Sequence, residues 1–180
     1  MLLFKVPVIV HAPTVAVPYE SCGETAAITA GAWMLYAWFA APGDRRWLGF
    51  AVGDKGVRIA EGLYGLALLA FGSSHFAYAG ETAALVPGWL PWHLVWAYFF
   101  GLAYVAAGAA MLVGLYARLA ATLSAFQMGL FTLLVWVPVV VAGANAFQWS
   151  EFVVSSALTA SAWVVADACR DLPWFAAGKR

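Results

Sequence analysis

Four ionisable side chains stand out in this chain because charged or titratable groups are costly in apolar surroundings and mark functional sites there. They are His75, Glu81, His93 and Glu151, each near one end of an apolar stretch. If the fold brings them to one level, they could hydrogen-bond the head group of a quinone. They could also ligate a metal, with His75 and His93 as nitrogen ligands. In the alternative, His75 and Glu151 only hold helices together.

A second group, Arg58, Glu61 and Arg118, predicts a structural ion pair. Glu61 lies three residues after Arg58, and Arg118 arrives from a neighbouring turn. Glu61 and His75 are separated by about 21 Å along a helix at 1.5 Å per residue, so they cannot form a catalytic pair. A proton-transfer role for Glu61 would need a deeper polar group on an adjacent helix, and Gln127 is the candidate.

Composition indicates a membrane protein. The 180 residues are 64% hydrophobic and 10% charged, whereas soluble domains carry about 25% charged residues. A net charge of zero without a basic run excludes nucleic acid as a partner and leaves membrane lipids. Two cysteines, Cys22 and Cys169, without a Cys-x-x-Cys motif, argue against a thiol-disulfide exchanger.

The elements that position these residues are apolar stretches long enough to cross a bilayer core of roughly 30 Å as helices. They comprise residues 25–41, 57–79, 93–116, 119–142 and 149–168. The two-residue turn at Ala117 and Arg118 predicts antiparallel neighbours. The predicted fold class is therefore all-α: a polytopic membrane protein with an antiparallel four-helix transmembrane bundle and one additional N-terminal transmembrane helix.

The domain boundaries follow from these spans. Residues 1–24 form an external N-terminal segment, 25–41 the additional helix, 57–168 the four-helix bundle and 169–180 a cytoplasmic tail. Pro7 interrupts the apolar start, and no basic region precedes that start, so we expect the N-terminus to be retained rather than cleaved as a signal peptide.

Positive charge predicts the orientation, because cytoplasmic loops retain Lys and Arg. Eight of the nine basic residues fall on one side of the threaded chain, and Lys5 alone falls on the other. The eight are Arg45, Arg46, Lys55, Arg58, Arg118, Arg170, Lys179 and Arg180. We therefore expect the N-terminus outside and the C-terminus in the cytoplasm.

Small residues predict where the helices touch, since close approach in lipid depends on them. These are Gly65, Gly72, Gly101, Ala107, Gly108, Ala120, Ala121, Gly129, Ser155, Thr159 and Ala162. Pro138 predicts a kink, because it removes a backbone donor and frees a carbonyl one turn earlier. The apolar segment 85–92 carries Pro87 and Pro91 and could cap the bundle or dock a partner.

From about Arg58 to Asp167 the chain resembles the DoxX family of small bacterial membrane proteins. The resemblance rests on four motifs. These are Gly72-x-x-His75-Phe76, then Leu85-Val86-Pro87-x-Trp89-Leu90-Pro91, and the Gly101-Leu102-Ala103-Tyr104 and Arg118-Leu119-Ala120-Ala121 stretches. It implies a four-helix bundle in the bacterial inner membrane, redox processes linked to quinone, action beside other proteins, and importance for His75 and Phe76.

Three functions remain open. The first is an accessory or scaffolding subunit of a membrane redox complex, whose partners are other membrane or periplasmic subunits. The second is a quinone-binding oxidoreductase with its site at the outer face around His75 and Glu151, for which a quinone or a lipid would be the bound molecule. The third, a small transporter, is disfavoured because paired broken helices and inverted repeats are absent from the sequence.

Overall fold

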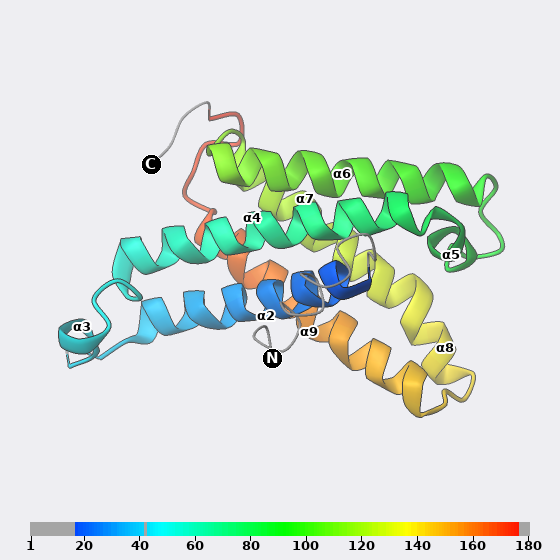
Figure 1. Cartoon of the computed structure of the whole chain (residues 1–180), viewed down its shortest axis with the longest axis horizontal. Helices are drawn as coiled ribbons and strands as arrows, with labels where there is room; N and C mark the ends of the chain where they lie inside the picture. Colours follow the sequence, from blue (N-terminus) through cyan, green and yellow to red (C-terminus); the bar gives the residue numbers. More distant parts are fainter. Residues whose placement is uncertain (1–16, 42, 177–180) are drawn as a thin grey trace.

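The computed structural model describes residues 17–41 and 43–176, which form helices and no strands (Figure 1). The long helices are α2 (Val17–Phe39), α4 (Gly53–Ala77), α6 (His93–Val113), α7 (Ala117–Phe131) and α9 (Ala146–Ala168). Shorter elements are α3 (Asp44–Trp47), α5 (Ala79–Ala84), the π-helical turn η1 (Thr132–Trp136) and α8 (Val137–Val141). The prediction of an all-helical chain is confirmed for these residues.

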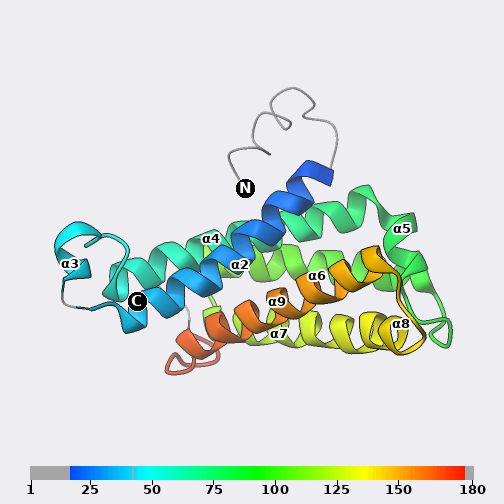
Figure 2. The same ribbon diagram turned by 90° about the horizontal axis from the view of Figure 1, so that it is seen from below.

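The long helices close into a ring (Figures 1 and 2). Helix α4 packs against α2 and α6, α7 packs against α6 and α9, and α9 packs back against α2. In the described part of the chain the backbones of α4 and α7 are not neighbours, so these two helices face one another across the middle of the ring, where α4 also touches α9. The side chains that fill this middle are therefore the ones that join opposite walls.

Glycines set the closeness of the α4–α6 contact, as predicted from the small residues. A Cβ atom on Gly72 would lie 2.5 Å from Val105 Cγ2 and 2.7 Å from the carbonyl oxygen of Gly101. One Gly pair further along, a Cβ on Gly108 would lie 2.7 Å from the carbonyl oxygen of Gly65. Any side chain at these positions would force the two backbones apart.

Helix α2 is held to α9 in the same manner. A Cβ on Gly31 would lie 2.6 Å from Ser161 Cβ and 2.7 Å from its Cα.

Helix α2 begins at Val17, so it extends the predicted span 25–41 into the segment predicted to be external. Residues 1–16 and 177–180 lie outside the described residues, as do the predictions of a retained N-terminus and of an external Lys5.

Pro138 disturbs its helix as predicted, and the disturbance takes the form of a π-helical turn. The turn Thr132–Trp136 lies directly before α8, in which Pro138 is near the first position. Because proline has no amide hydrogen, the regular hydrogen-bond ladder cannot continue through it, and a wider turn accommodates the break. The following helix starts earlier than predicted, since Asn145 and Gln148 form a capping box before α9.

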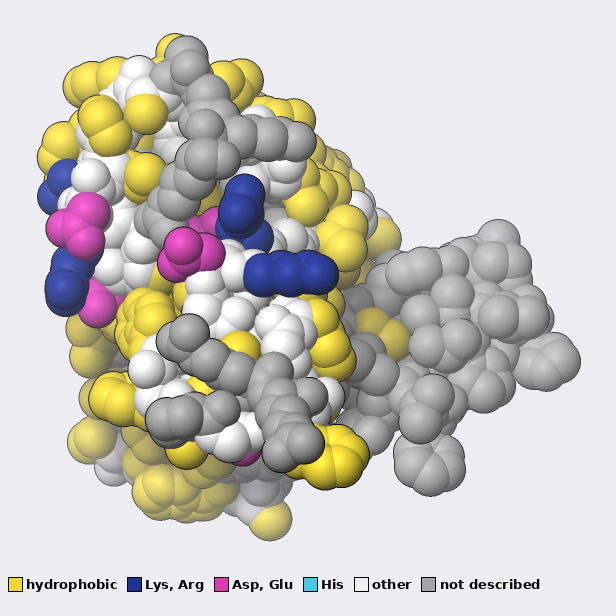
Figure 3. All heavy atoms as spheres, turned by 90° about the vertical axis from the view of Figure 1, so that its left-hand side faces the viewer, with side chains coloured by type: hydrophobic (Ala, Val, Ile, Leu, Met, Phe, Trp, Pro, Cys, Tyr) yellow, Lys and Arg dark blue, Asp and Glu magenta, His cyan; other side chains and the backbone are white. Residues whose placement is uncertain are grey.

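Basic side chains gather at one end of the bundle. Seen from the α3 end, Lys and Arg side chains gather there together with Asp and Glu (Figure 3). Elsewhere the helices expose large apolar side chains, among them Leu66, Phe99, Leu102, Phe126 and Leu133. Two helical runs, His93–Val113 and Ala117–Val141, are long and apolar enough to cross a membrane.

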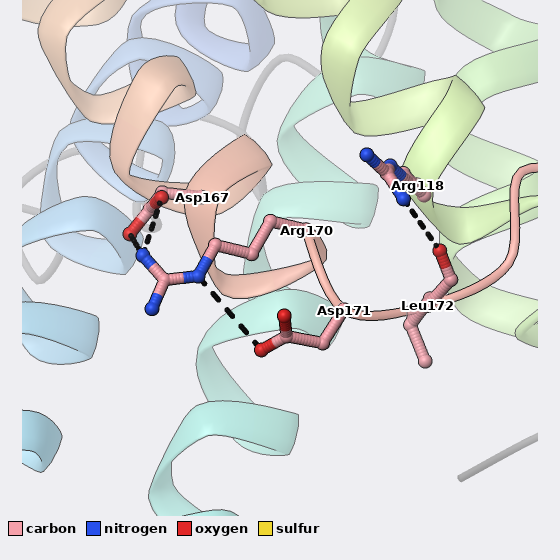
Figure 4. A network of polar contacts seen from close by, with 5 residues as sticks. All are labelled: Arg118, Asp167, Arg170, Asp171 and Leu172. Atoms are coloured by element: carbon pink, nitrogen blue, oxygen red, sulfur yellow. Dashed lines mark hydrogen bonds and ion pairs between the residues drawn. The ribbon is translucent and has the colours of Figure 1, made fainter.

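Residues 172–176, which we term the C-terminal strap, lie across the turn between α6 and α7 (Figure 4). Arg118 donates to the carbonyl oxygen of Leu172 at 3.1 Å, and its guanidinium lies 4.1 Å from the centre of the Trp174 ring. The Tyr116 amide donates to the carbonyl oxygen of Ala176 at 2.9 Å. Tyr116 has a φ of 51°, a conformation that bulky residues rarely adopt, so the strap fixes a strained turn.

Candidate functional site

His75 lies in the last turn of α4, half-buried against α6. Its Nδ1 lies 2.8 Å from the carbonyl oxygen of Phe71. A carbonyl can only accept, so Nδ1 carries the hydrogen, and in the neutral ring Nε2 keeps a lone pair. The imidazole meets the Tyr104 ring edge-on, with centroids 5.3 Å apart. His75 is thus oriented by its own helix, with Nε2 available as an acceptor.

Tyr104 connects His75 to α7. It is buried, and its ring also contacts Phe71 at a centroid distance of 5.8 Å. Its hydroxyl interacts with the side chain of Gln127 on α7. The Gln127 amide donates to the carbonyl oxygen of Phe100 at 3.3 Å, which fixes the amide beside α6. Gln127, which the sequence analysis named as a deeper polar group, therefore lies against Tyr104. The sequence analysis did not assign Tyr104 to the site.

Tyr64 fills the middle of the ring. Its side chain is fully buried, and its hydroxyl lies 3.0 Å from Ser124 Oγ and 3.9 Å from Met128 Sδ. Ser124 Oγ also donates to the carbonyl oxygen of Ala121 at 2.9 Å. Each hydroxyl has one hydrogen to give, and either of the two can be the donor in the contact between Tyr64 and Ser124. This side chain joins α4 to α7 across the interior.

The other predicted outer-face residues occupy separate elements. Glu81 is exposed on α5, His93 is the first residue of α6, and Glu151 is in the second turn of α9. The contacts of His75 described above involve none of these three. Among the residues that the structure describes, no group of three or more His, Cys, Asp and Glu side chains is placed to hold a metal ion. The His75 and His93 metal site remains a prediction.

Glu151 is close to a carboxylate that the sequence analysis did not connect with it. Glu20 lies at the start of α2, before the first predicted span. The Glu20 and Glu151 carboxylates are close enough to repel each other. The contact follows from the packing of α2 on α9, which could not be read from spacing along the chain.

The structure gives Glu61 a neighbour that the sequence analysis did not name, and the predicted ion pair with Arg58 or Arg118 remains a prediction. Glu61 accepts a hydrogen bond from the buried Cys169 Sγ at 3.7 Å. Arg170 forms ion pairs with Asp167 at 3.1 Å and with Asp171 at 3.8 Å (Figure 4). Arg118 contacts the strap. The reason is the chain reversal after α9, which brings carbonyl groups and Trp174 over the α6–α7 turn.

A second polar cluster joins η1 to α9. Thr132 Oγ1 lies 2.7 Å from Ser155 Oγ and 2.9 Å from Thr159 Oγ1. Ser155 and Thr159, which the sequence analysis placed at helix contacts, therefore face the interior of the bundle. Beside the cluster, an apolar groove of about 480 Å³ opens between α7 and α9, lined by residues that include Phe126, Leu133 and Trp163.

The segment before α6 presents two tryptophans outward. Trp89 is 72% exposed and Trp92 is 77% exposed. Trp92 also has a φ of 57°, in the left-handed region. Such a conformation costs about 1–3 kcal/mol for a residue with a side chain, and the Trp92 indole stays largely exposed among the described residues. The neighbouring Trp96 holds the segment by donating to the carbonyl oxygen of Pro91 at 3.1 Å.

Comparisons with protein-family models, with curated proteins and with solved structures find no match to this chain. The DoxX resemblance consequently remains a prediction carried by the motifs around His75, Pro87 and Arg118.

Proposed function

We propose that this chain is an integral membrane protein of the bacterial inner membrane, built as a DoxX-like four-helix bundle of α4, α6, α7–α8 and α9 with α2 as an additional helix. Helices of 23 and 25 residues, such as α2 and α4, extend about 35 Å or more at 1.5 Å per residue, enough for a bilayer core of roughly 30 Å. The outward apolar side chains and the charged residues at one end support this arrangement. The same charges favour an external N-terminus and a cytoplasmic C-terminus.

We further propose that it serves as an accessory or scaffolding subunit of a membrane redox complex. The observation that carries this proposal is the strained and exposed Trp92 beside the exposed Trp89. Exposed aromatic side chains on a stiff backbone are typical anchors of protein–protein contacts. A partner that buries both indoles, either a membrane subunit or a periplasmic one, would offset the cost of the Trp92 backbone.

The test is recovery of a partner in mild detergent. The wild-type chain is expected to co-purify with one larger protein in fixed stoichiometry. Combining Trp89→Ala with Trp92→Gly should reduce that recovery at least tenfold. The Tm of the purified chain should stay the same or rise, because glycine tolerates positive φ.

Trp47 provides the matched control, since it is 85% exposed on α3 at the opposite end of the bundle. Trp47→Ala should leave the partner bound. A wild-type chain that is clean and monodisperse in mild detergent, or a double variant that keeps its partner, would contradict the subunit proposal.

A second candidate function, quinone binding, is favoured by the geometry of His75. Its Nε2 is an available acceptor next to the Tyr104 ring, so a reduced quinone could donate a hydroxyl hydrogen there. In proteoliposomes, His75→Ala should weaken quinone binding at least tenfold, whereas Glu81→Gln on exposed α5 should not. Equal binding by wild type and His75→Ala would remove this candidate.

A further inference from the structure

The apolar groove between α7 and α9 lies halfway along both helices, which run side by side (Figure 2). Gly129 is at the midpoint of the helical run formed by α7, η1 and α8, and Ser156 is near the middle of α9. Phe126 and Leu133 on one wall and Trp163 on the other are each more than half exposed. In a chain that spans the bilayer as proposed above, the groove therefore opens sideways into the hydrocarbon core, and a ligand site there rests on that proposed function.

A glycine leaves the space between the two helices. Within 4 Å, a Cβ atom at Gly129 would meet one described atom outside its own helix, the Cγ2 of Thr159 at 3.7 Å, which is an ordinary van der Waals contact. The π-helical turn η1 begins one turn further on at Thr132, and such turns are frequent at functional sites. The groove volume of about 480 Å³ is within the range of small-molecule sites. It equals roughly one turn of a helix 10–12 Å across, so the groove is too small to seat another helix along its length.

Hydroxyl oxygens that line the groove can accept a hydrogen bond. Ser156 Oγ donates to the carbonyl oxygen of Phe152 at 2.7 Å, and Thr159 Oγ1 donates to the carbonyl oxygen of Ser155 at 2.9 Å. Each hydroxyl has a single hydrogen, which its own helix already engages, and each oxygen keeps lone pairs. The groove therefore presents hydrogen-bond acceptors in an otherwise apolar wall.

The depth and the acceptors together select the ligand. A charged head group does not reach the middle of the bilayer at low cost, and an acyl chain has no hydrogen to donate. A neutral molecule with a hydroxyl loses its water partners at that depth, and an acceptor on the protein offsets this loss. We propose that the groove binds a neutral, bilayer-soluble molecule whose hydroxyl donates to Ser156 or Thr159, while its apolar body lies against Phe126 and Leu133.

Photolabelling with two matched probes tests the proposal. One probe is a long-chain alkylphenol that carries a diazirine in its chain. The other is the methyl ether of the same molecule, which has the same apolar body and no donor. In liposomes that contain the purified chain, the phenol is expected to label the groove residues of α7 and α9 at least threefold more than the ether, as mapped by mass spectrometry. Equal labelling of those residues by the two probes would overturn the proposal.

Two variants connect the labelling to the groove. Gly129→Leu fills the groove at a position where a Cβ atom is accommodated, so it should elute as wild type and lose at least tenfold of the phenol labelling. Gly62→Leu on α4, where a Cβ atom meets no described atom within 4 Å, is the control and should label as wild type. Ser156→Ala removes an acceptor whose hydrogen bond lies within its own helix, and it should lower phenol labelling toward that of the ether. Wild-type labelling of both Gly129→Leu and Ser156→Ala would contradict the site.

Flotation of the reconstituted chain with its liposomes reports membrane residence separately. A chain that does not float would remove the proposed membrane function and this site with it. A chain that floats and is labelled equally by the two probes would remove the site alone.

Discussion

Replacing Gly72 with leucine is expected to prevent α4 from docking on α6, and the bundle from forming with it. A Cβ atom there already meets Val105 Cγ2 at 2.5 Å and the Gly101 carbonyl oxygen at 2.7 Å. The second contact is with backbone, which cannot move aside as a flexible side chain can. Overpacking that forces side chains and backbone to shift typically costs about 1–3 kcal/mol, and occasionally more. The measurement is the Tm and the elution profile of the variant in detergent.

Gly62 supplies the control on the same helix. A Cβ atom at Gly62 meets no other atom within 4 Å. Gly62→Leu should therefore leave the Tm unchanged or raise it, because glycine is a poor helix former by about 1 kcal/mol. Similar losses for the two variants would show that the Gly72 contact does not set the spacing of α4 and α6.

Tyr64→Ala should produce the second large effect, a loss of about 3–5 kcal/mol in the free energy of unfolding, as for other large buried aromatics. The side chain is fully buried and reaches across to Ser124 and Met128, while the backbones of α4 and α7 are not neighbours. Its removal leaves a central cavity that no neighbouring backbone can close.

Reversible unfolding in mixed micelles measures this loss. Tyr64→Phe keeps the ring and should cost only about 1 kcal/mol, the usual net contribution of one hydrogen bond. Tyr98→Ala, at an exposed position on α6, serves as the control and should change the free energy of unfolding little. If Tyr64→Ala and Tyr98→Ala reduce the free energy of unfolding by the same amount, the contacts of Tyr64 with α7 do not stabilise the bundle.

Local features of the fold could be predicted from the sequence because each follows from the chemistry of single residues or of short runs, independent of how the helices pack. Apolar runs of about 20 residues must be helical in a bilayer, and the helices fall close to the predicted spans. Gly72 and Gly108 lie at contacts because only glycine allows backbones so close. Pro138 disturbs its helix because it lacks an amide hydrogen, wherever the helix packs.

The candidate site was harder to predict, because its members come together only through packing. Tyr64 and Tyr104 count as apolar residues in a hydrophobicity pattern, so their hydroxyls gave no signal. Glu151 lies near Glu20 because α2 packs on α9. Arg118 contacts the strap because the chain reverses after α9, so its partner could not be inferred from the spacing between Arg58 and Glu61.

The C-terminal strap has a consequence for biosynthesis. Residues 172–176 are synthesised after α6 and α7, yet they hold Tyr116 in its left-handed conformation and bind Arg118. Until those residues are in place, the α6–α7 turn lacks the contacts that fix its backbone. Closure of the bundle at this corner is thus a late step of folding, and a chain truncated before Leu172 would lack these contacts.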